Sequence, residues 1–301
     1  MPRAAKPIKE SANKAELAKV KSVKPKALAE TPAKANVRPR KPPASGALAK
    51  AVTIVDAATL DWRPAGKEGL ALKVVREDRA KGLFLGAVAF EPMARSGLHQ
   101  HQGVATSFFA RGGLTDYSGS AVLHDIGINL KGSTHDAIAY ESSLLISRLE
   151  GPVTYPEGAG SLHGLHIGAY HAEVENERPD VAPEINVPLA SVSAFATGVQ
   201  GLTRRTLFDY AGVGDNHRML QWTLRPGTTV PRFKATALVE MWMHAGDLAI
   251  NGASAHADCF VIIEPGQEVS LASAFGARLL VWTEGPALAV DALEPNGLFG
   301  Y

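Results

Sequence analysis

The chain has 301 residues, a formal net charge of +1 and a hydrophobic content of 46%. It has no apolar run near the roughly 20 residues of a membrane-spanning helix and no apolar signal-peptide segment, so the sequence predicts a soluble cytoplasmic protein that does not contact membranes. Cys259 is the single cysteine, which excludes an intrachain disulfide and a cysteine-cluster metal site.

Residues 1–50 differ sharply in charge from the rest of the chain. They hold 13 Lys and Arg against 3 Glu, whereas residues 51–301 hold 18 basic and 27 acidic residues. The segment is rich in Ala, Lys and Pro and lacks aromatic residues, so it buries too little apolar surface to offset the entropy of ordering. We expect a disordered tail that makes non-specific contact with a polyanion or with the acidic body, although a solubilising extension explains it equally well.

Beyond the tail, short apolar runs alternate with Gly, Pro and other turn residues. Their lengths are typical of strands, and few stretches show helical periodicity. This pattern predicts an all-β fold, an antiparallel sandwich or barrel. The clearest expected strands are 70–75, 82–92, 105–113, 121–130 and 143–151.

An internal repeat indicates that the fold is duplicated. The stretch WRPAGKEGLALKVVRED (62–78) is matched by FATGVQGLTRRTLFDY (195–210), and LLISRLEGP (144–152) is matched by LLVWTEGP (279–286). The separation is nearly constant, because Gly69 pairs with Gly201 and Pro152 with Pro286. We therefore expect two β domains and draw the boundaries as follows: tail 1–50, first domain 51–152, connector 153–188 and second domain 189–301.

The stretch GLHQHQGVATSFFARGG (97–113) carries the candidate site. His99 and His101 are two residues apart, so on a strand they point to the same face. We expect Thr106 and Phe108 to return along the neighbouring strand and His135, in GSTH, to close the site. Three imidazoles would then converge as metal ligands, although alternating histidines also occur on solvated strands.

These residues resemble the two motifs of the cupin superfamily. HQHQGVATSFFARGG is similar to the first motif, His-x-His followed by Glu and Gly, and HDIGINLKGSTH (124–135) to the second, whose turn delivers a third histidine. With the repeat, the resemblance is to a bicupin, which implies two jelly-roll barrels in tandem. Residues 52–152 are similar both to cupin domains of zinc-dependent anti-sigma factors and to 2,4'-dihydroxyacetophenone dioxygenase; 189–291 match only in outline.

The sequence departs from the cupin pattern where the family carries its glutamate ligand. We place Thr106 there, and a neutral hydroxyl is a poor ligand for a divalent metal. A three-histidine set leaves coordination positions open, which favours one Fe(II). Zn(II), Mn(II), Ni(II) and Cu(II) also suit three imidazoles, and loss of the glutamate is equally what a decayed site would show.

The second repeat lacks the ligands. Aligning Gly246 with Gly113 places Arg232 and Lys234 opposite His99 and His101, Val239 opposite Thr106, and Val269 opposite His135. We expect a degenerate second barrel with a structural or dimerisation role, and hence a homo-oligomer, with the homodimer favoured.

The sequence contains no phosphate-binding Gly-Lys-Ser/Thr loop, Gly-x-Ser-x-Gly elbow or dinucleotide fingerprint. We favour an O2-dependent dioxygenase that cleaves a small hydroxyketone, diketone or phenolic substrate, with Phe108 walling the pocket and Asp116 and Tyr140 as candidate orienting residues. A metal-binding regulator of the anti-sigma type and a non-catalytic bicupin scaffold are the alternatives.

Three further histidines lie on the connector. They would either fold over the barrel mouth as part of a lid or lie on the surface: His163, His166 and His171.

Overall fold

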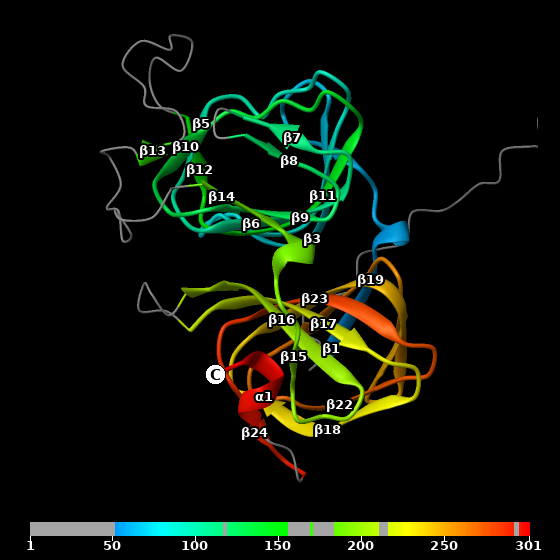
Figure 1. The fold of residues 1–301 in the computed structure, drawn as a ribbon. Helices are drawn as coiled ribbons and strands as arrows, with labels where there is room; N and C mark the ends of the chain where they lie inside the picture. Colours follow the sequence, from blue (N-terminus) through cyan, green and yellow to red (C-terminus); the bar gives the residue numbers. More distant parts are fainter. Residues whose placement is uncertain (1–51, 117–118, 156–168, 171–183, 211–215, 292–294) are drawn as a thin grey trace, which may run out of the picture. The chain divides into compact units, whose positions relative to one another are not determined.

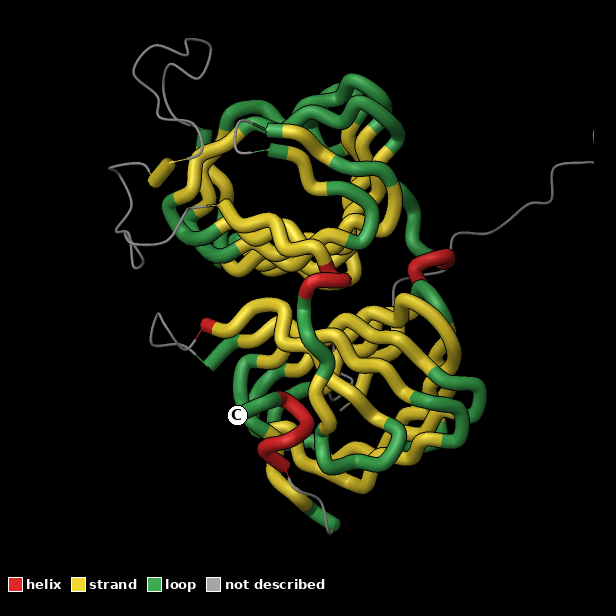
Figure 2. The backbone as a smooth tube through the Cα atoms, viewed as in Figure 1, coloured by secondary structure: helices red, strands yellow, loops and turns green. Residues whose placement is uncertain are grey.

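A computed structural model describes residues 52–116, 119–155, 169–170, 184–210, 216–291 and 295–301. The predicted tail and the three connector histidines lie outside these residues. Strands are the main regular structure of the described residues, and the helical pieces are few and short (Figure 2). None of its helices has the length and apolar character needed to cross a membrane.

The first barrel contains the candidate site. Its larger sheet has the order β14-β9-β6-β11-β4-β3-β2, a smaller sheet has the order β12-β5-β10-β13, and β7 pairs with β8. All five strands expected from the sequence are present. The strands are β2 (Arg63–Pro64), β3 (Leu70–Asp78), β4 (Leu83–Phe90), β5 (His99–His101), β6 (Ala105–Arg111), β7 (Leu114–Thr115), β8 (Ser120–Ala121), β9 (Asp125–Asn129), β10 (Ser133–His135), β11 (Ser143–Glu150), β12 (Val153–Thr154), β13 (Ala169–Tyr170) and β14 (Glu184–Pro188).

The second barrel repeats this plan. Its strand order is β15-β16-β17-β23-β19-β22-β18-β24. In addition, β20 and β21 both pair with β19, and β1 pairs with β21. The elements are β1 (Val52–Asp56), β15 (Phe195–Ala196), β16 (Leu202–Asp209), β17 (Arg218–Leu224), β18 (Thr228–Ala235), β19 (Val239–Ile250), β20 (Ala253–His256), β21 (Cys259–Ile263), β22 (Glu268–Ser273), β23 (Ala277–Thr283), β24 (Ala287–Ala289) and the short helix α1 (Pro295–Phe299).

The two repeats exchange their first strands. Strand β1 pairs with β21 of the second barrel, and β14 pairs with β9 of the first (Figure 1). Val52 and Glu184, which begin these strands, have the same separation in sequence as the repeat pair Gly69 and Gly201. Each strand leads into a 3-10 turn, Ala57–Thr59 or Leu189–Ser191. The first and second barrels therefore do not coincide with residues 51–152 and 189–301, because each takes one strand from the other repeat.

Apolar side chains fill the interior of the second barrel. Phe233 pairs with Val269 as His99 pairs with His135, and Ala235 pairs with Ala287 as His101 pairs with Val153. The residues opposite the three histidines are thus Phe233, Ala235 and Val269, all buried. Phe299 of α1 adds to this core, since its ring stacks on that of Trp222 with centroids 5.3 Å apart.

This register corrects three positions of the sequence alignment, including the counterpart of Thr106, which is Glu240 rather than Val239. Arg232 is exposed and pairs with Asp291 at 3.0 Å, so it is not the counterpart of His99, and Ala235, not Lys234, is the counterpart of His101. The true match of Gly246 is Gly112, because both have positive φ (+87° and +63°) and both lie one residue beyond a register shift. Anchoring on Gly113 moved the alignment by one residue.

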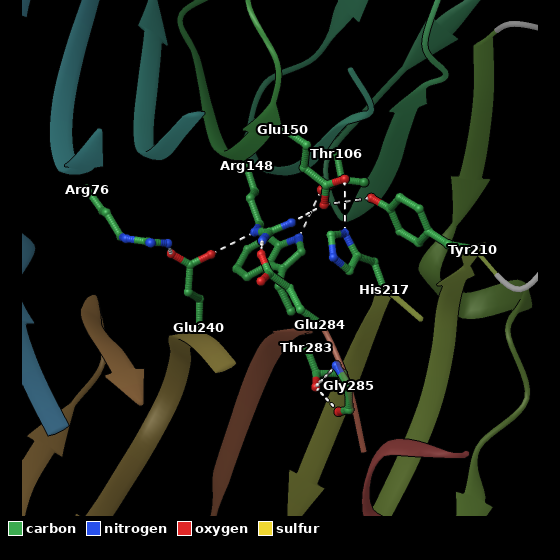
Figure 3. A network of polar contacts seen from close by, with 11 residues as sticks. Arg76, Thr106, Arg148, Glu150, Tyr210, His217, Glu240, Thr283, Glu284 and Gly285 are labelled. Carbon is green, nitrogen blue, oxygen red and sulfur yellow. Dashed lines mark hydrogen bonds and ion pairs between the residues drawn. The ribbon is translucent and has the colours of Figure 1, made fainter. Parts of the chain in front are cut away.

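Buried charges join the two barrels. The guanidinium of Arg148 on β11 contacts Glu240 of β19 at 2.7 Å and also reaches Glu150 and Glu284, as Figure 3 shows. Arg76 contacts the other oxygen of Glu240 at 2.8 Å. Because the Arg148 side chain is only 7% exposed, its charge is balanced by these carboxylates rather than by water.

Glu150 extends this network. It accepts hydrogen bonds from Tyr210 Oη at 3.0 Å and His217 Nδ1 at 3.3 Å (Figure 3). Burial opposes ionisation of Glu150, but the His217 hydrogen bond and the Arg148 charge outweigh it, so the pKa of Glu150 lies below its ordinary value. The contact between the barrels therefore holds an ionised carboxylate at neutral pH.

Candidate metal centre

Two short neighbouring strands bring the three histidines together. His99 and His101 lie on β5, and His135 lies on β10, where it is the register partner of His99. The Nε2 atom of His135 lies 3.1 Å from Nε2 of His99 and 3.0 Å from Nε2 of His101. The side chains of all three are buried. The predicted convergence of three imidazoles is therefore present in the structure.

The environment disfavours the charged form of His99 and His101. Burial, and then the neighbouring His135, lower the pKa of His99 to about 3. Burial, and then the two neighbouring imidazoles, hold the pKa of His101 well below its ordinary value. Neutral imidazole offers a nitrogen lone pair, which is the form that binds a metal.

Hydrogen bonds on the far side of two rings fix which nitrogen faces the centre. His99 Nδ1 donates to the carbonyl oxygen of Gly97 at 2.7 Å. His135 Nδ1 hydrogen-bonds Asp116 Oδ2 at 3.5 Å, and Glu184 Oε1 lies 3.2 Å from the same nitrogen as an ion-pair contact. With protons on Nδ1, both rings present Nε2 lone pairs to the centre. The structure thus places Asp116 where an orienting residue was expected, whereas Tyr140 is exposed on the surface.

Glu184 is a site residue that the sequence analysis missed. It follows His135 by 49 positions and lies on the segment that we interpreted as a connector. Only the pairing of β14 with β9 brings it to the histidines. The repeat offset was the available signal, because it makes Glu184 the counterpart of the strand residue Val52.

Thr106 and Phe108 lie on the face of β6 that points away from the histidines, contrary to expectation. Thr106 Oγ1 accepts a hydrogen bond from Trp282 Nε1 of the second barrel at 2.9 Å. Phe108 packs against Trp242 with ring centroids 5.6 Å apart. The side chains of β6 that line the cavity are Ala105, Ser107 and Phe109. The turn between β5 and β6 sets this face, so Ala105 rather than Thr106 stands where a carboxylate ligand would enter.

A cavity of about 350 Å³ adjoins the three histidines. Its walls are largely apolar and include Phe84, Phe90 and Phe109. Polar side chains also reach it: the hydroxyls of Ser107 and Ser147 hydrogen-bond each other at 2.8 Å, and the Lys67 ammonium lies 4.3 Å from the centroid of the Tyr155 ring. Further polar side chains on the wall are those of Asp116, Asn129, Glu184 and Asn186. This volume lies at the lower end of the range for small-molecule sites.

Residues 50–154 match the family model described as the ChrR cupin-like domain. Comparison with curated proteins finds none that matches the sequence. Among solved structures, a provisionally assigned dioxygenase of Nostoc punctiforme superposes with a TM-score of 0.65 at 10% identity, over 80% of this chain and 85% of that one.

Oxalate decarboxylases show the same architecture. The Lactobacillus farciminis enzyme, in a formate complex, superposes with a TM-score of 0.53 at 12% identity, over 78% of this chain and 87% of its own. The Bacillus subtilis enzyme, described with Mn(II) centres, superposes with a TM-score of 0.51 at 13% identity, over 77% of each chain. At these identities the likeness shows the fold, two jelly-roll barrels in tandem.

Proposed function

We propose that this chain, whose residues 50–154 match the ChrR cupin-like domain and whose fold is two jelly-roll barrels in tandem, is a metal-dependent dioxygenase for a small hydroxyketone, diketone or phenolic compound. The observation that carries the proposal is the convergence of three buried imidazoles on the wall of a largely apolar cavity. Ala105 at the entry point of a carboxylate ligand leaves that side of the centre open.

The donor set fits one divalent transition metal. His99, His101 and His135 would hold it through Nε2, and three protein ligands leave positions for substrate and O2. Imidazole suits Fe, Zn, Ni and Cu, and we favour Fe(II) because the reaction uses O2. Bound there, the metal supplies Lewis acidity and a path for electrons between substrate and O2.

The cavity suits a small substrate with an aromatic or branched apolar group. Phe84, Phe90 and Phe109 offer apolar surface for that group and exclude water around it. Lys67 offers a positive charge to a carbonyl, enolate or phenolate oxygen.

Cleavage of a hydroxyketone balances without any further reductant. R–CO–CH2OH and O2 give R–COOH and HCOOH, with the carbon–carbon bond broken and both oxygen atoms of O2 retained in the products. No nicotinamide or flavin is consumed, in keeping with a sequence that has no dinucleotide fingerprint.

Metal analysis combined with O2 uptake tests the proposal. Purified or reconstituted protein should hold about one metal per chain, since the second barrel has apolar counterparts of the histidines. A panel of hydroxyketones, diketones and phenols should include one that consumes O2 and releases an acid in equal amounts. His135→Ala should abolish both metal binding and uptake, whereas His256→Ala, an exposed residue of the second barrel, should change neither. Two metals per chain would contradict the assignment.

The family match to the ChrR cupin-like domain favours a second candidate, a metal-binding regulator of the anti-sigma type. That function requires the metal but no consumption of O2. Stoichiometric metal without uptake on any substrate of the panel would support the regulator, and failure to bind metal after reconstitution would support a scaffold.

A further inference from the structure

The candidate metal centre draws on both repeats. We infer that Glu184, on the strand that the second repeat contributes to the first barrel, is a positioning residue that holds His135 in the orientation required for metal binding. The inference rests on the proposed metal site at His99, His101 and His135. The exchange of strands between the repeats would then serve metal binding as well as the fold.

The sheet register places Glu184 on the inner face of the barrel. Glu184 pairs with Asn129 on β9, and Asn129 pairs with Ala105 on β6. Residues directly opposite one another in a sheet point to the same face. These three positions therefore form one row that faces the cavity, and all three side chains line its wall. In this row, Ala105 stands where cupins carry their glutamate ligand. The row does contain a glutamate, Glu184, but it lies two strands away.

The contact to His135 is close and buried. Glu184 Oε1 lies 3.2 Å from His135 Nδ1, and the Glu184 side chain is only 4% exposed. A carboxylate that accepts the Nδ1 proton fixes the tautomer, holds the ring plane and makes Nε2 a stronger donor to a metal. Asp116 faces the same nitrogen at 3.5 Å with a more exposed side chain. His135 Nδ1 forms its hydrogen bond with Asp116, and Glu184, which is closer and more deeply buried, places a second carboxylate against the same nitrogen and restrains the ring from that side.

The equivalent position of the first repeat carries an apolar residue. Val52, the counterpart of Glu184, pairs with Ile263 in the second barrel, whose interior has Phe233 and Val269 in place of histidines. The polar row and the histidines thus occur together in one barrel and are both replaced by apolar residues in the other. This joint occurrence is expected if Glu184 serves the histidines.

Metal titration of full-length variants tests the inference. The metal-free wild type, Glu184→Ala and Glu184→Gln are titrated with Co(II) and Zn(II) against a competing chelator, and the visible spectrum of bound Co(II) reports the ligand geometry. Loss of an outer carboxylate costs about 10- to 100-fold in metal affinity, so Glu184→Ala should lose that much with an altered Co(II) spectrum. Glu184→Gln keeps the shape and a polar oxygen beside Nδ1 but removes the negative charge, and it should lose less. Asn186→Ala, on the same face of β14, is the matched control and should bind as the wild type does.

The outcomes separate this inference from the proposed function. A wild type that binds no metal overturns both. A wild type that binds metal with Glu184→Ala unchanged overturns this inference alone. Asp116→Asn should weaken binding less than Glu184→Ala, and the reverse order would assign the role to Asp116 instead. If thermal unfolding shows that Glu184→Ala is misfolded, Glu184→Gln decides, because unchanged affinity and an unchanged Co(II) spectrum in that isosteric variant overturn the inference.

Discussion

The indole nitrogen of Trp282 donates a hydrogen bond to the hydroxyl of Thr106 at 2.9 Å, across the contact between the two barrels. Trp282 is the repeat counterpart of Arg148, and Thr106 that of Glu240, since Arg148 pairs with Thr106 within one sheet as Trp282 pairs with Glu240 in the other. Arg148 reaches Glu240 at 2.7 Å in the reciprocal contact. The duplicated positions thus bind each other crosswise, once through a neutral hydrogen bond and once through an ion pair.

Removing the Thr106 hydroxyl should destabilise the protein without disturbing the candidate metal centre. Thr106→Val preserves shape but leaves the buried indole N–H of Trp282 without its acceptor, which costs about 1–3 kcal/mol. Urea unfolding of Thr106→Val, Trp282→Phe and the double variant should give a coupling of about 1 kcal/mol between the two residues. An additive double variant, or weaker metal binding by Thr106→Val, would contradict the placement of Thr106.

Restoring a carboxylate on the inner face of β6 should tighten metal binding. Ala105→Glu adds a negative ligand that points toward the histidines and fills a coordination position needed by O2 or substrate. We expect at least about tenfold tighter binding, equivalent to about 1.4 kcal/mol, with O2 uptake reduced. Thr106→Glu is the matched control, because its side chain lies on the opposite face and should leave metal affinity unchanged. Tighter binding by Thr106→Glu instead would show that the face is assigned incorrectly.

Loss of the buried guanidinium between the barrels should be costly. Arg148→Met keeps much of the apolar stem but removes the most buried cation beside Glu240 and Glu150, leaving Glu240 with only the half-exposed Arg76, and removal of one partner of such a buried pair costs about 3–5 kcal/mol. The double variant Arg148→Met/Glu240→Gln should recover part of that loss. Arg232→Met removes an exposed ion pair and should leave the unfolding free energy unchanged. Equal effects of Arg148→Met and Arg232→Met in urea unfolding would refute a stabilising role for the buried network.

The metal-free protein should lose stability in mild acid. Burial lowers the pKa of His99 to about 3 from an ordinary value of 6.5, so below pH 6.5 the unfolded chain binds a proton that the folded protein excludes. Stability is therefore retained above pH 6.5 and falls as the pH drops from there toward 3, by as much as about 1.4 kcal/mol per pH unit for one such group.

The second barrel supplies the variant that tests this pH dependence. His99→Phe/His101→Ala/His135→Val copies the apolar residues at the equivalent positions and removes the titrating groups. Urea unfolding between pH 7 and pH 4 should show a shallower slope for this variant than for the metal-free wild type. Parallel slopes would mean that other groups govern the acid sensitivity.

The three histidines were predictable because their signal is local. Two lie on one short strand, the third follows a turn, and the period of a strand brings His99 and His101 to one face. The face of β6 was not predictable in this way, since a turn of only three residues, 102–104, decides whether Ala105 or Thr106 points inward. A one-residue error there moves every side chain of the strand to the other face.

Glu184 and the Arg148 network depend on contacts that sequence spacing does not reveal. The repeat indicated duplication, but not that each repeat gives its first strand to the other barrel. No sequence motif marks Arg148 or Glu240, and the two residues pair only because the two barrels contact each other. Local sequence patterns were therefore enough to identify the candidate metal ligands. Identifying the residues that support those ligands required knowledge of the strand topology.

The exchanged strands also constrain how the chain folds during synthesis. Strand β1 emerges from the ribosome early, but its partner β21 is made about 200 residues later. The first barrel, in turn, has all its strands only after β14 has been made, beyond its own repeat. Contacts of such long range slow folding and leave strand edges exposed in the meantime. Val52–Asp56 must remain unpaired with β21 until nearly the whole chain exists, and a ribosome stalled between the repeats would release a first barrel with an open edge at β9.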